Sequence, residues 1–170
     1  MAGYGLQNEQ HLSVVLQKSL ELGGHNIEII NGSVSGSTSA GGLNIAEWTL
    51  SENNIDLMIL CLGANDMLRG INPKETKKNL EEIIKIAKNK KIKVIIAGMI
   101  APTSYGFSYK KSFDKIFSDL SKKYKLQLIP FLLEGVAQKP EFNLSDGMHP
   151  NDQGTIIIGN TIKKAILKNL

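Results

Sequence analysis

Residues 55–66 read IDLMILCLGAND, an apolar run that ends directly in a polar turn. A continuous apolar run of this kind is typical of a strand that is buried on both faces of a parallel sheet. Residues 55–62 are therefore predicted to form a buried strand. Outward from this stretch, other short runs rich in β-branched and aliphatic residues occur at 27–34, 92–99 and 126–129.

Amphipathic helical patterns separate these runs along the chain. Apolar residues recur at helical spacing in segments 9–22, 39–51, 73–88 and 109–124, and again in a final segment at about 152–168. Pro73 and Pro150 stand where prolines open helices, and Asn72 and Asn151 are suited to cap those helices. Strands that alternate with helices predict an α/β fold with a mostly parallel sheet covered on both faces.

Composition narrows the class of protein. The chain has 170 residues, of which 42% are hydrophobic and 21% charged, and this balance is typical of a globular domain. No linker, repeat or low-complexity stretch interrupts the pattern, so residues 1–170 are predicted to form a single domain. No stretch approaches the roughly 20 apolar residues that a membrane span needs, which argues against stable membrane insertion.

The charges and the single cysteine exclude further classes. The net charge is +4, but the lysines are spread along the chain. The densest run, at 88–91, has no interleaved aromatic residues, so a solvated helix end is favoured over a nucleic-acid site. Cys61 is the only cysteine, which excludes an intramolecular disulfide and any cysteine-based metal cluster.

Ligands of open α/β sheets bind at the carboxyl ends of the strands, so polar clusters at those ends are the candidate sites. The first cluster is the segment 31–38, which reads NGSVSGST. It predicts a glycine turn in which Ser37 or Thr38 caps the next helix. The alternative is that its glycines let a backbone N–H approach a substrate oxyanion.

The second cluster follows the buried strand at 55–62 and contains Asn65 and Asp66. The Asn65 side chain either caps a turn or points its amide N–H groups into the crevice as an oxyanion donor. Asp66 is then placed to fix the loop. Position alone does not separate these two roles for Asn65.

The third cluster precedes the final helix, where residues 145–151 read SDGMHPN. Nucleophilic catalysis needs an imidazole base and a carboxylate that holds its tautomer. An aspartate three residues before a histidine in a tight turn, as Asp146 precedes His149, can place its oxygens against imidazole Nδ1–H. The alternative is a surface loop with an incidental histidine. His11 and His25 have no such neighbours and are interpreted as incidental.

The order of these blocks resembles the SGNH (GDSL-like) hydrolases, and among them the bacterial multifunctional acyl-CoA thioesterases, arylesterases and lysophospholipases. In that family four short blocks contribute Ser, Gly, Asn and His. Gly36 matches the family glycine and Asn65 matches the asparagine, although many members have a glycine where this chain has Ala64. Asp146 and His149 match the Asp-x-x-His block.

The chain departs from the family at its start. The family opens with a strand that ends in Gly-Asp-Ser-Leu, commonly followed by a run ending in Ala-Gly-Tyr-Gly-Leu, whereas residues 1–6 here read MAGYGL. The match therefore begins inside that block and places the nucleophilic serine upstream of Met1. The serines in or beside the glycine block are not assigned as the nucleophile; they are Ser33, Ser35, Ser37 and Ser39.

The resemblance implies a three-layer α/β/α, flavodoxin-like fold whose first strand, central in the sheet, is absent. It also implies two-step acyl transfer with no cofactor and no metal. His149 would be the base, Asp146 would orient it, and Gly36 and Asn65 would form the oxyanion hole. The substrate would be a small acyl ester or thioester. Four loop residues would line an acyl channel or serve only in loop packing: Met67, Leu68, Pro102 and Tyr105.

Three hypotheses follow from the sequence. The first is a serine hydrolase whose serine lies upstream, and the second is a catalytically dead, truncated pseudoenzyme that binds acyl compounds. The third is a non-enzymatic flavodoxin-like binding module, which the absence of a glycine-rich phosphate loop disfavours. Acyl length, the preference between ester and thioester, oligomeric state, and a periplasmic or cytoplasmic location are left open by the sequence.

Overall fold

The structure, a computed structural model, describes residues 3–51 and 54–170. Met1 and Ala2, the first residues of the block compared with the family opening, lie outside this range. Internal contacts divide the chain into two compact units, one from Gly36–Phe131 and one from Met1–Ser35 together with Leu132–Leu170. Each unit is described by itself, and the single domain expected from the sequence stays a prediction.

The Gly36–Phe131 unit contains a parallel three-stranded sheet in the order β1 (Leu57–Leu60), β2 (Lys93–Ala97) and β3 (Gln127–Ile129). Leu57 lies opposite Lys93, and Ile95 lies opposite Gln127. The α/β class with a parallel sheet, predicted from the alternating pattern, is confirmed. Each strand is shorter than the apolar run that predicted it, because only residues whose backbone is hydrogen-bonded to a neighbouring strand belong to the strand.

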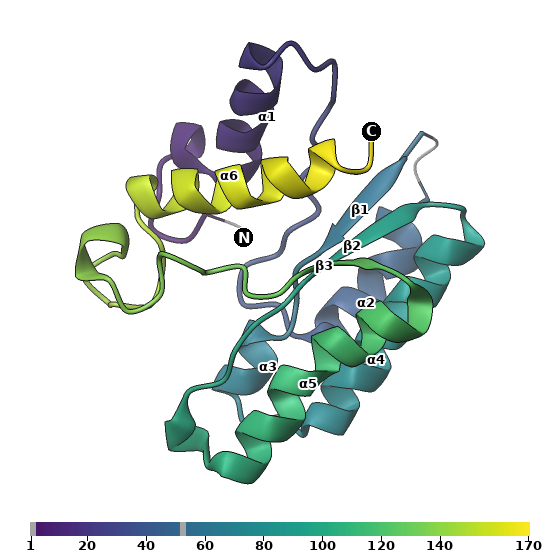
Figure 1. Cartoon of the computed structure of the whole chain (residues 1–170), viewed down its shortest axis with the longest axis vertical. Helices are drawn as coiled ribbons and strands as arrows, with labels where there is room; N and C mark the ends of the chain where they lie inside the picture. The colour runs from purple at the N-terminus through teal and green to yellow at the C-terminus, as the bar shows by residue number, and fades with distance from the viewer. Residues whose placement is uncertain (1–2, 52–53) are drawn as a thin grey trace. The chain divides into compact units, whose positions relative to one another are not determined.

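Helices cover one side of this sheet within the unit (Figure 1). They are α2 (Ser39–Thr49), α4 (Pro73–Asn89) and α5 (Phe107–Tyr124), with the short α3 (Ala64–Leu68) and the 3₁₀ turn η2 (Thr103–Tyr105) in the connections. As expected, Asn72 accepts a hydrogen bond from the Lys74 N–H and caps α4. Thr38 caps α2 in the same way, by accepting from Gly41 N–H.

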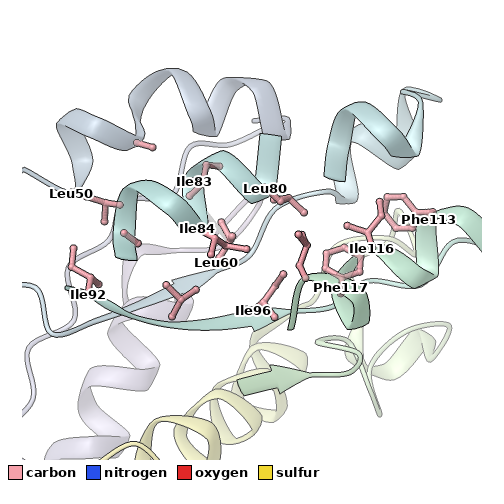
Figure 2. Close-up of a cluster of buried hydrophobic side chains, with 14 of the residues drawn as sticks. Leu50, Leu60, Leu80, Ile83, Ile84, Ile92, Ile96, Phe113, Ile116 and Phe117 are labelled. Carbon is pink, nitrogen blue, oxygen red and sulfur yellow. The ribbon is translucent and has the colours of Figure 1, made fainter. Parts of the chain in front are cut away.

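The core of this unit lies between the helices and the sheet (Figure 2). Leu80 and Ile84 of α4 and Phe117 of α5 are buried in one cluster with Leu60 of β1 and Ile96 of β2. Burial of aliphatic and aromatic side chains at this interface is what holds each strand end, and hence each polar loop that follows it, at a fixed position.

The second unit is built around α1 (Leu12–Leu22) and α6 (Asp152–Leu167), which pack together (Figure 1). It also contains the 3₁₀ turns η1 (Asn8–Gln10) and η3 (Pro140–Phe142). Leu16 and Leu20 of α1 and Ile158 and Ile162 of α6 are buried. The apolar spacing in both segments therefore marks the buried face of each helix, as predicted.

The strand predicted at 27–34 is wrong, because none of these residues is in a strand. The Gln17 side chain, and not a neighbouring strand, pairs with the backbone of this segment. Gln17 Nε2 donates to the Ile27 carbonyl at 2.8 Å, and the Ile29 N–H donates to Gln17 Oε1 at 2.7 Å. Further along, Ile30 and Val34 are exposed. Apolar β-branched residues favour a strand only when a neighbouring strand accepts and donates the backbone hydrogen bonds.

Candidate active site

Gly36 has left-handed backbone geometry, with φ at +71°, in the turn that leads into α2. Its carbonyl accepts a hydrogen bond from Arg69 Nη2 at 3.0 Å. Within the two described ranges, no protein acceptor is recorded for the Gly36 N–H, and the residue is exposed. The N–H group that the sequence singled out as an oxyanion donor is therefore available to a ligand.

Asn65 lies on α3, which begins after a short connection from β1, and not in the open turn that its position suggested. Its Nδ2 donates a hydrogen bond to the carbonyl of Ser37 at 3.0 Å. A carboxamide carries two N–H donors, so one remains for another acceptor. Asn65 and Arg69 thus hold the carbonyls of two neighbouring residues, Ser37 and Gly36, and the two predicted oxyanion donors come together in one unit.

Asp66 is fully buried and links the start of α2, which follows the glycine turn, to α4. Its carboxyl group accepts from the Ser39 N–H at 2.7 Å, from the Ser39 hydroxyl, and from Thr76 Oγ1 at 3.1 Å. Asn79 Nδ2 in turn donates to Ser39 Oγ at 3.0 Å. Asp66 therefore fixes the start of α2, and the expectation that it fixes the turn after the 55–62 strand stays a prediction. Sequence reasoning missed its partners, because neither Ser39 nor Thr76 carries a motif that points to Asp66.

His149 and Asp146 form a hydrogen-bonded pair in the loop before α6. Asp146 Oδ2 lies 2.8 Å from His149 Nδ1, and the other carboxylate oxygen accepts from the backbone N–H groups of Met148 and His149 at 2.8 and 2.9 Å. The Leu144 N–H donates to the His149 carbonyl at 2.7 Å and closes the turn. The predicted contact between the two side chains is confirmed; their catalytic roles stay a prediction.

Because Nδ1 is paired with Asp146, Nε2 is the nitrogen of His149 that can accept a proton. A carboxylate at Nδ1 favours the tautomer with the proton on Nδ1, so Nε2 carries the lone pair. In the part of the chain that the structure describes, no hydrogen-bond partner is recorded for Nε2, and the His149 side chain is 41% exposed. The arrangement can accept a proton from a hydroxyl group. The expectation that His149 faces the same crevice as Asn65 and Gly36 stays a prediction.

Hydrogen bonds lower the pKa of Asp146 to about 2, from the His149 backbone N–H first and then from the His149 side chain and the Met148 N–H. All three donors favour the charged carboxylate. Because the pKa is lower in the folded chain than in the unfolded one, the stability that Asp146 contributes is complete above its ordinary value of 3.8. It is lost as the pH falls through about 2.

We therefore expect Asp146 to stay ionised in acid that protonates exposed aspartates. A ¹³C NMR titration of the Asp146 carboxyl group should give a midpoint near 2 in the folded chain, and a midpoint near the ordinary value of 3.8 when the chain is unfolded in urea. The same midpoint for Asp146 in the folded and the unfolded chain would show that the turn does not hold the carboxylate in solution.

The four residues proposed for acyl binding are placed differently from one another. Met67 is buried in the core of its unit, which favours loop packing for this residue. Leu68 and Pro102 are exposed, and the half-buried Tyr105 stacks on Tyr109 with ring centroids 5.5 Å apart. Their role in acyl binding stays a prediction.

Tyr105 also lines an open hollow together with Gly70, Phe107 and Tyr109. The loop before it is anchored through Ala101, whose N–H donates to Asp114 and whose carbonyl accepts from Lys110, both at 2.8 Å. The loop that carries Pro102 is therefore held by two charged side chains of α5, neither of which the sequence had marked.

The next features concern metal-binding side chains and membrane-spanning helices. Across ranges 3–51 and 54–170, no cluster of three His, Cys, Asp or Glu side chains is placed to hold a metal ion. Over the same ranges, no helix is both long enough and apolar enough to cross a membrane.

The chain is similar to known esterases and thioesterases in sequence and in structure. Residues 1–155 match the GDSL-like lipase/acylhydrolase family. An arylesterase of Vibrio mimicus is 34% identical over 169 residues, which cover 99% of this chain and 84% of that protein. Thioesterase 1/protease 1/lysophospholipase L1 of Escherichia coli K12 is 31% identical over 138 residues, or 81% of this chain and 66% of that protein. A crystal structure of TesA, 32% identical, superposes with a TM-score of 0.93 and covers 99% of this chain and 94% of its own.

Proposed function

The chain belongs to the GDSL-like lipase/acylhydrolase family, and we propose that it acts in a serine hydrolase of carboxylic esters and acyl thioesters. The observation that carries the proposal is the Asp146–His149 pair, which leaves Nε2 of His149 free to take a proton. Relatives named as an arylesterase and as a thioesterase and lysophospholipase support the substrate class. The nucleophilic serine lies upstream of Met1 in this proposal.

The reaction proceeds in two steps. The serine oxygen attacks the acyl carbonyl while its proton passes to His149 Nε2, and Asp146 stabilises the imidazolium through Nδ1–H. The negative charge on the carbonyl oxygen is held by the serine N–H, the Gly36 N–H and the Asn65 amide. The alcohol or thiol leaves with the proton from His149. Water, deprotonated by the same histidine, then releases the acyl group and regenerates the serine.

An unpaired strand edge supports the upstream position of the serine. Within the described residues, β1 pairs with β2 alone, so its other edge has no strand beside it. An exposed edge of an apolar parallel strand is a site where another strand is expected to pair. A strand ending in Gly-Asp-Ser-Leu, paired with β1, would place its serine at the carboxyl ends of the strands. That is also where β1 delivers Asn65.

The test compares the 170-residue chain with an extended form, defined as the same chain preceded by such a strand. Both are incubated with p-nitrophenyl esters and with acyl-CoA thioesters, quenched in acid and measured by intact-mass and peptide mass spectrometry. We expect an acyl adduct on the upstream serine of the extended form and none on the 170-residue chain. An adduct on Ser33, Ser35, Ser37 or Ser39 would refute the upstream assignment. A folded extended form that binds acyl compounds without an adduct or turnover would identify a pseudoenzyme.

A further inference from the structure

The ring of Tyr4 lies against the imidazole of His149, with centroids 4.4 Å apart and planes tilted by 34°. Tyr4 is 60% exposed, so the need to bury a large side chain does not explain its position. The contact is made by the ring, and no hydrogen bond of the Tyr4 hydroxyl is recorded in the described ranges. The position of the Tyr4 ring must therefore be set by the backbone around Tyr4.

That backbone is a tight turn whose shape requires glycine on both sides of Tyr4. Leu6 N–H donates to the Gly3 carbonyl at 3.0 Å, and φ is +76° at Gly3 and +71° at Gly5. A Cβ on Gly3 would lie 2.1 Å from His11 Cδ2, a separation that no folded chain tolerates. Any other residue in either glycine position would therefore be strained by the positive φ and would push against the side chain of His11 or Leu144.

The turn also packs against the loop that carries His149. A Cβ on Gly5 would lie 2.7 Å from Leu144 Cδ1, so the backbone at Gly5 sits directly against that side chain. Leu144 is the residue whose N–H donates to the His149 carbonyl. On the other side, His11 Nε2 lies 3.3 Å from the Leu6 carbonyl. His11, interpreted from the sequence as incidental, therefore contacts this turn and supports it.

We propose that Tyr4 is a positioning residue for His149, an inference that rests on the proposed function. The hydrogen bond to Asp146 holds the imidazole at its edge, through Nδ1, and makes no contact with either face of the ring. Tyr4 covers one face of the ring and restrains its tilt, which holds the direction of Nε2. The negative face of an aromatic ring also favours the imidazolium that forms during proton transfer.

The test uses NMR spectroscopy of the 170-residue chain with Tyr4→Leu and Tyr4→Phe. In mildly alkaline solution, ¹H shifts of the His149 ring report the aromatic neighbour, and long-range ¹H–¹⁵N spectra report the tautomer. With Tyr4→Leu, we expect the ring-current shift to vanish. We expect the Nε2–H tautomer fraction to rise by roughly two- to twelvefold, the range that corresponds to the contact energy of an aromatic pair. With Tyr4→Phe, which keeps the ring, both readouts should stay at their native values.

His25 serves as the internal reference in the same spectra, and its signals should not move in either variant. Unchanged His149 signals in Tyr4→Leu would overturn the inference, as would a Tyr4→Phe chain that behaves like Tyr4→Leu. A Tyr4→Leu chain that loses the amide spectrum of the native fold would also overturn it, since a positioning role predicts a local change. No hydrolysis enters these measurements, so an inert extended form would refute the proposed function and leave this result standing.

Discussion

Replacing His149 by alanine in the extended form will lower kcat for p-nitrophenyl ester hydrolysis by on the order of 10⁴- to 10⁶-fold. The loss is this large because the serine hydroxyl is a weak nucleophile without a base, and His149 Nε2 is the nitrogen that the Asp146 contact leaves free. KM should change much less, since binding of the acyl group does not use the imidazole. Initial-rate kinetics over a range of ester concentrations separate the two constants.

The matched control is His25→Ala in the same extended form, which removes an imidazole that has no carboxylate partner in the proposed site. It should leave kcat within about twofold of the unmodified form, as expected for a residue outside the site. Asn65→Ala should fall between these variants, with a loss of roughly 10²- to 10³-fold for one oxyanion donor. A His149→Ala enzyme that keeps more than a tenth of the activity would contradict the assignment of the base.

Replacing Asp66 by alanine will lower the free energy of unfolding by roughly 3–5 kcal/mol. The substitution leaves three buried donors without their acceptor, namely the N–H and hydroxyl of Ser39 and the hydroxyl of Thr76. Both Ser39 and Thr76 are fully buried, so water cannot replace the lost carboxyl group without opening the core. Urea denaturation followed by circular dichroism measures the change.

Asp56→Ala is the matched control, because Asp56 is an exposed aspartate just before the same strand that delivers Asp66. Its free energy of unfolding should stay within about 0.5 kcal/mol of the unmodified chain. Asp66→Asn keeps the shape and one acceptor oxygen, so it should lie between the two. If Asp66→Ala unfolds at the same urea concentration as Asp56→Ala, the buried hydrogen bonds of Asp66 do not stabilise the fold.

Local patterns in the sequence predicted the elements that depend on nearby residues. The Asn72 cap and the apolar spacing place α4 to within a residue, and Asn151 caps α6 by accepting from Gly154 N–H. The Asp146–His149 contact was also predictable, because the two residues are only three positions apart in a tight turn, which brings their side chains together. In each case the partners are close in the chain, so spacing alone constrains their geometry.

Features that depend on distant partners were not predictable in this way. Ser39 and Asp66 are 27 residues apart, and no motif connects them, yet they share a buried hydrogen bond. The segment 27–34 has the composition of a strand, but Gln17 binds its backbone in place of a neighbouring strand. Asn65 lies on a five-residue helix, α3, that is too short to leave a periodic signal.

The pairing of α1 with α6 has a consequence for synthesis on the ribosome. Translation delivers α6 about 130 residues after α1, which at roughly 5–20 residues per second is a delay on the order of ten seconds. During that interval the apolar stripe of α1 at Leu12, Leu16 and Leu20 has no partner helix, whereas the contiguous Gly36–Phe131 unit can already fold. The Asp146–His149 loop emerges at the end of this delay, so the proposed base and its carboxylate partner are synthesised after the other residues proposed for catalysis in this chain.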